Sequence, residues 1–204
     1  PCPFFLGTAL VTACRLDCGV ADAAGLLSVT MLPNRLCFLV VNALGGCAIF
    51  GSYLHGIVTH AEPGKTLWGG VPLGLQPLYT VSMLTASLGF VLWFVYFFRL
   101  LPDAARLFGG RWSLRALYLP LLMIHICSTL WMPLTFRYVA SPSPLGWALV
   151  RIDLLLVGLG ALLLIAAAAT STPRGRGFVL ALVGACAFSF QTAVLDALVW
   201  PSLF

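Results

Sequence analysis

Five apolar runs, each long enough to cross a bilayer, constrain this chain more than any other feature of its sequence. The runs cover residues 35–59, 75–101, 114–136, 145–169 and 178–200. An α-helix rises 1.5 Å per residue, so about 20 residues cross the hydrocarbon core. Breaks rich in proline and glycine, such as TSTPRGRG, separate the runs. The sequence therefore predicts an all-α integral membrane protein, a five-helix bundle in which consecutive helices are antiparallel neighbours.

Composition supports lipid as the solvent for most of this chain. Of the 204 residues, 61% are hydrophobic and only 8% are charged, whereas soluble domains are nearer 25% charged. The loops between the runs are too short to form a water-soluble domain. We therefore expect one membrane domain, residues 35–204, preceded by an extension, residues 1–34.

The extension opens with the apolar run PCPFFLGTALVTAC, and Arg15, Asp17 and Asp22 follow it directly. This run is too short to span a bilayer. We expect an interfacial helix or a helix packed against a partner, and the remainder of a processed targeting sequence is the alternative.

Basic residues are distributed unequally between the two ends of such a bundle. Eight of the eleven lie at the end that carries the extension: Arg15, Arg35, Arg99, Arg106, Arg111, Arg115, Arg174 and Arg176. Only Lys65 and Arg137 lie at the other end. The positive-inside rule then places the N-terminus on the cytoplasmic or equivalent organellar face. We expect a mitochondrial or plastid membrane, and the sequence contains no basic-aromatic patch typical of nucleic-acid binding.

Three charged residues fall within the apolar runs away from their basic ends. Arg151 and Asp153 begin the fourth run, and Asp196 lies near the end of the fifth. Because Arg151 and Asp153 are about 200° apart around a helix, they cannot easily pair with each other. Antiparallel geometry gives Arg151 and Asp196 similar depths, so we expect an ion pair that joins two helices. The alternative is that the Arg151 side chain extends to the membrane surface.

Aromatic and polar residues converge near the less basic end of the bundle. A planar ligand bound there would lie beside Trp131, Trp147, Tyr79 and His125, beneath the loop that carries Trp68. His125 is either an interhelical hydrogen-bonding residue or, for haem or chlorophyll, the first candidate for an axial ligand. The tryptophans and tyrosine are alternatively residues of the aromatic belt at the membrane interface.

The sequence contains none of the common catalytic or metal-binding motifs. The seven cysteines form no CxxC pair, and HExxH, GxSxG and phosphate-binding glycine loops are missing. We therefore expect no catalytic residues and no metal site, and a protein that is not an enzyme.

One segment resembles a known family. Trp131-Met-Pro133-Leu-Thr-Phe136, followed by GWALV at 146–150 and DLLL at 153–156, is similar to helices 3 and 4 of the translocator proteins. These are also called tryptophan-rich sensory proteins or peripheral benzodiazepine receptors. The similarity is strongest over residues 130–157, and Arg151 stands where the family has an acid. The resemblance implies a non-enzymatic bundle that binds tetrapyrroles, sterols or other lipids beneath the loop at 60–74, with Phe136 among the candidate contacts.

A second function fits the same composition. The chain could instead be a structural accessory subunit of a large organellar respiratory or photosynthetic membrane complex. Its partners would then be other membrane subunits or a second copy, besides membrane lipids. The sequence does not identify a cofactor: haem, porphyrin and chlorophyll are candidates under the first function, and lipid is expected to bind.

Overall fold

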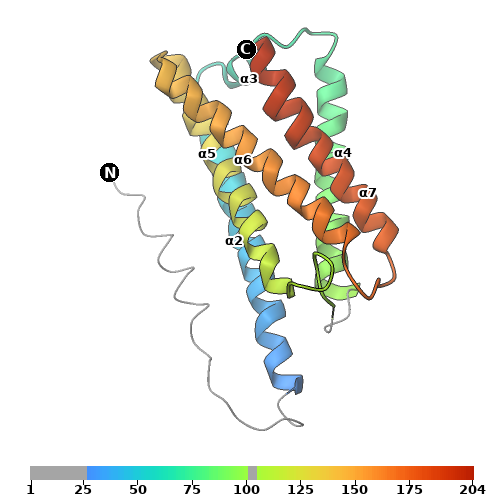
Figure 1. Ribbon diagram of the computed structural model, residues 1–204. Coiled ribbons are helices and arrows are strands. Elements are labelled where there is room, and N and C mark those ends of the chain that lie inside the picture. The colour runs from blue at the N-terminus through green and yellow to red at the C-terminus, as the bar shows by residue number, and fades with distance from the viewer. Residues whose placement is uncertain (1–26, 101–104) are drawn as a thin grey trace.

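A computed structural model describes residues 27–100 and 105–204, and within them long helices run side by side (Figure 1). The elements, in chain order, are α2 (Leu27–Thr59), α3 (Pro63–Trp68), α4 (Gln76–Val95), η1 (Tyr96–Leu100), η2 (Leu114–Leu117), α5 (Tyr118–Ala140), α6 (Pro144–Ala169), α7 (Phe178–Ser189), η3 (Phe190–Val199) and α8 (Trp200–Leu203). Five segments are long and apolar enough to cross a membrane: 35–59, 76–99, 114–140, 144–169 and 178–203. The predicted all-α membrane bundle is confirmed.

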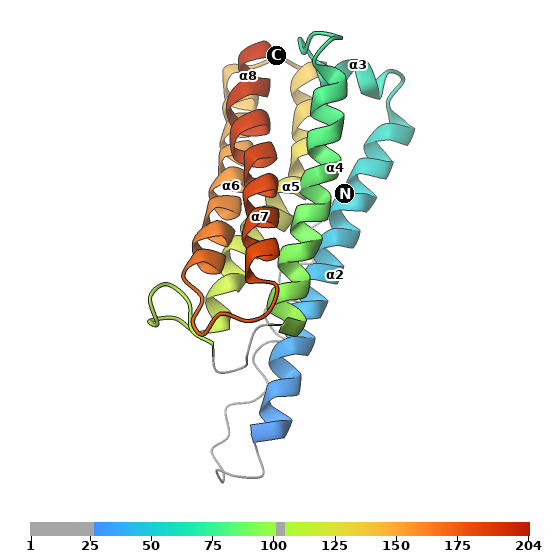
Figure 2. The ribbon, with the colours of Figure 1, turned by 90° about the vertical axis from the view of Figure 1, so that its right-hand side faces the viewer.

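The helices are arranged in an order that differs from their order in the chain. Helix α5 packs between α2 and α6, α6 packs on α7 and η3, and α4 packs mainly on α7. The loop carrying α3 and the C-terminus lie at one end of the bundle (Figure 2), and the connections at 105–117 and 170–177 lie at the other. The expectation that consecutive helices are neighbours therefore holds for α5 with α6 and for α6 with α7, but α4 lies against α7.

Two glycines explain why α4 lies against α7. A Cβ on Gly89 would meet the backbone carbonyl of Gly184, and a Cβ on Gly184 would meet that of Gly89. The two backbones therefore approach more closely than any larger side chain would allow. This contact fixes α4 to the C-terminal span.

Helix α5 continues four residues beyond the predicted end at 136. Pro133 lies inside it, and proline provides no N–H for the carbonyl four residues earlier. The hydroxyl of Ser52 on α2 donates to that carbonyl, the oxygen of Thr129, at 2.7 Å. A neighbouring helix thus supplies the missing donor, and the helix runs through the proline to Ala140.

Helix α2 begins at Leu27, so the last residues of the predicted extension are helical and continuous with the first span. The expectation of an interfacial or partner-packed segment falls on residues 1–26, which lie outside the described part of the chain.

Two buried clusters fill the bundle. One lies towards the basic end and is built on Trp93, Tyr96, Leu117, Leu121 and Leu164. The other lies at the opposite end, and we call it the aromatic cap. Its members include Trp68, Tyr79, Trp147, Trp200 and Phe204.

Candidate functional site

A cavity of about 460 Å³ lies within the bundle, and all five spans contribute to its wall. Its apolar lining includes Ile49, Phe90, Ile124, Leu154 and Phe188. Cavities of roughly 300–1,000 Å³ with mostly apolar walls and a few polar groups are typical of small-molecule sites. This cavity is therefore the candidate functional site.

The cavity reaches the outer surface of the bundle between α2 and α4. Phe50 on α2 and Met83 on α4 both line it, yet 72% and 46% of their surfaces are exposed. These two helices meet through the stacked rings of Phe38 and Phe94, whose centroids are 5.4 Å apart. An opening on this face of a membrane bundle adjoins the hydrocarbon of the bilayer.

The principal polar pair in the cavity comes from the C-terminal span. Gln191 Nε2 donates to Asp196 Oδ1 at 2.7 Å, and both residues line the cavity. They lie on η3, a ten-residue π-helix. Because a π-helix repeats its hydrogen bonds at i→i+5, side chains five residues apart come together. A regular α-helix instead brings together residues three or four apart.

Further polar atoms on the cavity wall have no hydrogen-bond partner. These are Asn42 Oδ1, Trp131 Nε1 and Gln191 Oε1, each buried within the protein. A buried polar atom without a partner is unfavourable by about 1–3 kcal/mol, and such atoms are uncommon in native structures. These lining residues thus carry two acceptors and one donor that no described residue satisfies.

Tyr53, which lines the cavity, places a phenol near the carboxyls of Asp153 and Asp196. Its ring contacts Trp131, with centroids 5.8 Å apart, and both Asp153 and Asp196 act on it electrostatically. Asp153 itself is buried, and its Oδ2 has no partner. The cavity wall therefore carries one carboxyl, that of Asp196, and the phenol of Tyr53.

His125 lies on the cavity wall in a defined orientation. Its Nδ1 lies 2.6 Å from the carbonyl oxygen of Leu121, which can only accept, so Nδ1 donates the proton. The other nitrogen, Nε2, is then an acceptor. A backbone carbonyl bound to one ring nitrogen is the usual support for a histidine whose other nitrogen binds a metal, so His125 fits the axial role expected for haem or chlorophyll.

The predicted ligand residues divide among three places. Trp131 and His125 line the cavity, and Trp131 also packs against the aromatic cap. Trp68, Tyr79 and Trp147 belong to the aromatic cap, where the Trp147 and Phe204 rings stack 5.4 Å apart.

Phe136, the candidate taken from the family motif, lies elsewhere. Its ring stacks on His60 with centroids 3.6 Å apart, in a separate groove between α2 and α5. The cap and the cavity do adjoin, since the rings of Trp131 and Trp200 lie 5.9 Å apart.

The expected Arg151–Asp196 ion pair does not form in the structure. Arg151 is exposed, and across residues 27–100 and 105–204 the ion pair within 4.0 Å is Lys65–Glu62. The inward face of α6 carries Val150 and Asp153, which directs Arg151 outwards. Asp196 faces the cavity instead, because its π-helix places it beside Gln191.

Sequence reasoning missed several lining residues. Gln191 was detectable, as an amide inside an apolar run, and so was Asn42. Tyr53, Ser128 and Thr192 gave no such signal because they are common in membrane helices. Among the residues that the structure describes, no group of three metal-ligating side chains occurs.

Comparisons with protein-family models, curated proteins and solved structures show no match to this chain.

Proposed function

We propose that this protein binds a hydrophobic molecule in the cavity of its five-helix membrane bundle, without catalysing a reaction. The observation that supports the proposal is the cavity itself, to which every span contributes and in which polar atoms lack partners. A ligand that supplied those partners would remove an unfavourable term from the folded state. The resemblance of residues 130–157 to translocator proteins favours the same function.

The lining favours a flat, apolar ligand with a polar end. Phe90, Trp131 and Phe188 provide aromatic walls, which give large contact area with few rotatable bonds. Asp196, Gln191 and Asn42 each contribute a side-chain oxygen to the lining. The polar end of the ligand is therefore expected to donate hydrogen bonds, as a hydroxyl, an amine or a pyrrole N–H does. Tetrapyrroles and sterols both meet this description.

A metal-containing tetrapyrrole would use His125. If such a group were bound, its metal would accept a nitrogen ligand, and His125 would hold it through the ring nitrogen that does not bond to Leu121 O. Replacing His125 by alanine should then abolish the absorption shift of added haem. The same change should affect metal-free porphyrin much less.

Paired tryptophan variants test the proposal. Purified protein in lipid nanodiscs is titrated with protoporphyrin IX and, separately, with a fluorescent sterol, and the polarisation of the probe's own emission is followed. Trp131→Leu, which changes the cavity, should weaken binding about tenfold. Trp147→Leu removes the same side chain from the aromatic cap and serves as the control.

Equal affinity of the probe for wild type and for both variants would mean that the ligand does not bind in the cavity. The absence of saturable binding of either probe by wild type, together with recovery of the chain in a stoichiometric complex, would favour the accessory-subunit function.

The proposed location of the protein is either the mitochondrial or the plastid membrane, with the N-terminus on the basic side.

A further inference from the structure

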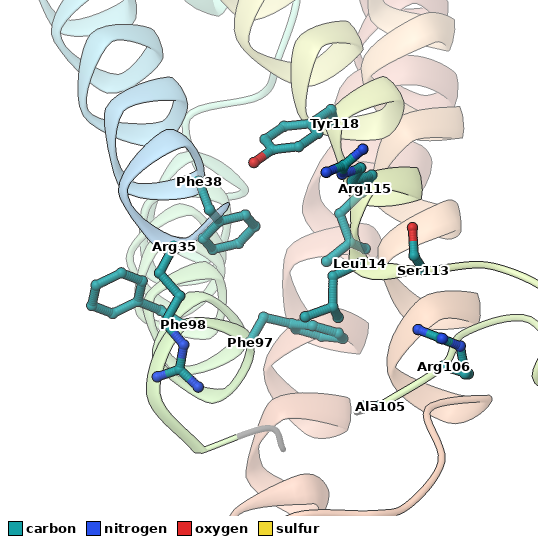
Figure 3. Close-up of a pocket in the computed structure, with 11 residues that line it drawn as sticks. Arg35, Phe38, Phe97, Phe98, Ala105, Arg106, Ser113, Leu114, Arg115 and Tyr118 are labelled. Atoms are coloured by element: carbon teal, nitrogen blue, oxygen red, sulfur yellow. The ribbon is translucent and has the colours of Figure 1, made fainter. Parts of the chain in front are cut away.

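A second cavity, separate from the central one, lies at the basic end of the bundle. It has a volume of about 210 Å³ and is enclosed by parts of α2, η1, η2, α5 and the connection before η2. Figure 3 shows its lining, with Arg35 on the α2 side and Arg106 and Ser113 on the opposite side. The central ligand site uses none of these residues.

The chemistry of this pocket changes from its floor to its rim. Phe38, Phe97 and Leu117 are buried and make the floor apolar. Three arginines, Arg35, Arg106 and Arg115, belong to its lining, together with the hydroxyls of Ser113 and Tyr118. None of the acidic residues in the described ranges lines the pocket. The lining thus carries three positive charges and two hydroxyls above an apolar floor.

The pocket lies at the level where lipid headgroups would be. Arg35 and Leu114 are the first residues of two spans, and Arg99 is the last residue of another. The nearby side chain of Trp112 is 59% exposed, and tryptophan is enriched at the membrane–water interface. A polar group bound at the rim could therefore remain attached to a lipid whose chains lie in the bilayer.

Backbone hydrogen bonds hold one arginine-bearing segment in place. Arg106 N donates to Thr172 O at 2.8 Å, and Thr172 N donates to Arg106 O at 2.9 Å. Phe108 N also donates to the Thr170 hydroxyl at 2.8 Å. Two connections far apart in sequence thus support each other, and Arg106 is presented from a fixed backbone.

We propose that this pocket binds the phosphate of an anionic membrane lipid, with arginine side chains of its lining at the phosphate and the phenyl rings beneath the glycerol. Guanidinium groups form paired hydrogen bonds with phosphate oxygens. Basic pockets between membrane helices on the cytoplasmic or matrix side are typical sites for such headgroups. The proposal is independent of the ligand in the central cavity.

Two triple variants with equal loss of charge test the proposal. The pocket triple replaces three lining residues by glutamine: Arg35, Arg106 and Arg115. The control triple replaces three arginines that lie at the same end but outside the pocket: Arg99, Arg111 and Arg176. The intact chain is placed in phosphatidylcholine nanodiscs, and phosphatidylglycerol binding is measured by native mass spectrometry. Both triples lose general surface attraction, but the pocket triple should bind at least tenfold more weakly than the control triple.

Two further measurements distinguish lipid binding in the pocket from the effects of misfolding and from binding of free anions. Arg115→Lys keeps the charge on an exposed side chain but removes the paired geometry, and should by itself weaken binding several-fold. Inorganic phosphate up to millimolar concentrations should not displace the lipid. Equal binding by the two triples, unchanged binding by Arg115→Lys, or saturable displacement by inorganic phosphate would overturn the proposal.

Discussion

At the scale of single residues, the informative groups are those that a hydrocarbon environment disfavours. Ser52 supplies a hydrogen bond that Pro133 cannot, and Asp196 takes its hydrogen bond from Gln191. Neither hydrogen bond could be predicted from the amino-acid sequence. The sequence revealed that Asp196 was exceptional, but it did not show its partner, because the partner depends on a helix with a non-standard period.

Removing the Ser52 hydroxyl should destabilise the bundle. Ser52→Ala leaves the Thr129 carbonyl without its donor, and hydrogen bonds between membrane helices contribute on average about 0.6 kcal/mol. Ser87→Ala is the control, since that hydroxyl donates to Met83 O within its own helix. Unfolding in mixed detergent micelles should show a loss for Ser52→Ala only, and equal losses would contradict the role assigned to Ser52.

Asp196 should be energetically coupled to Gln191 and independent of Arg151. Residues in one hydrogen-bonded pair show coupling of about 0.5–3 kcal/mol, whereas independent sites add within about 0.3–0.5 kcal/mol. Double-mutant cycles with leucine at each position measure both quantities in the same assay. Coupling between Arg151 and Asp196 would restore the ion pair expected from helix depth and contradict the structure.

At the scale of helices, the sequence predicted more than at the residue scale. All five spans occur; the last four begin within one residue of the predicted positions, and the helix that contains the first span already begins at Leu27. Hydrophobic length is a strong signal because lipid imposes it on every span. The packing of α4 on α7 could not be predicted in the same way, because Gly89 and Gly184 are two of several glycines in apolar runs.

Gly89→Ala should separate α4 from α7. The added methyl group would meet the Gly184 carbonyl, and overpacking of this kind costs about 1–3 kcal/mol. Gly51→Ala adds the same group on α2 where nothing lies within 4 Å. The control should be neutral or stabilising because alanine favours helix. Detergent unfolding of both variants makes the comparison, and equal stability would mean that α4 and α7 are not in close contact.

At the scale of the whole molecule, the bundle combines a continuous apolar exterior with a cavity that contains polar groups. Two of the six predicted ligand residues, Trp131 and His125, line that cavity. Trp147, Tyr79 and Trp68 instead close the end of the bundle over the last helix, where Trp200 Nε1 donates to Leu67 O at 2.8 Å. The depth of each residue in the membrane could be estimated from topology. The rotation of each helix about its axis, which decides the residues that face the cavity, could not.

The most direct measurement identifies the hydrophobic molecules that copurify with the protein when a larger side chain fills its central cavity. Ala86 is buried and lines the cavity, so Ala86→Phe should occupy it, while Ala43→Phe adds the same ring to an exposed position on α2. Wild type and both variants are purified under mild detergent from their native membrane, and the retained hydrophobic molecules are identified by mass spectrometry. If the cavity binds a ligand, a molecule with a hydrogen-bond donor should copurify with wild type and with Ala43→Phe. It should be lost from folded Ala86→Phe. The same set of molecules in all three would contradict ligand binding in the cavity.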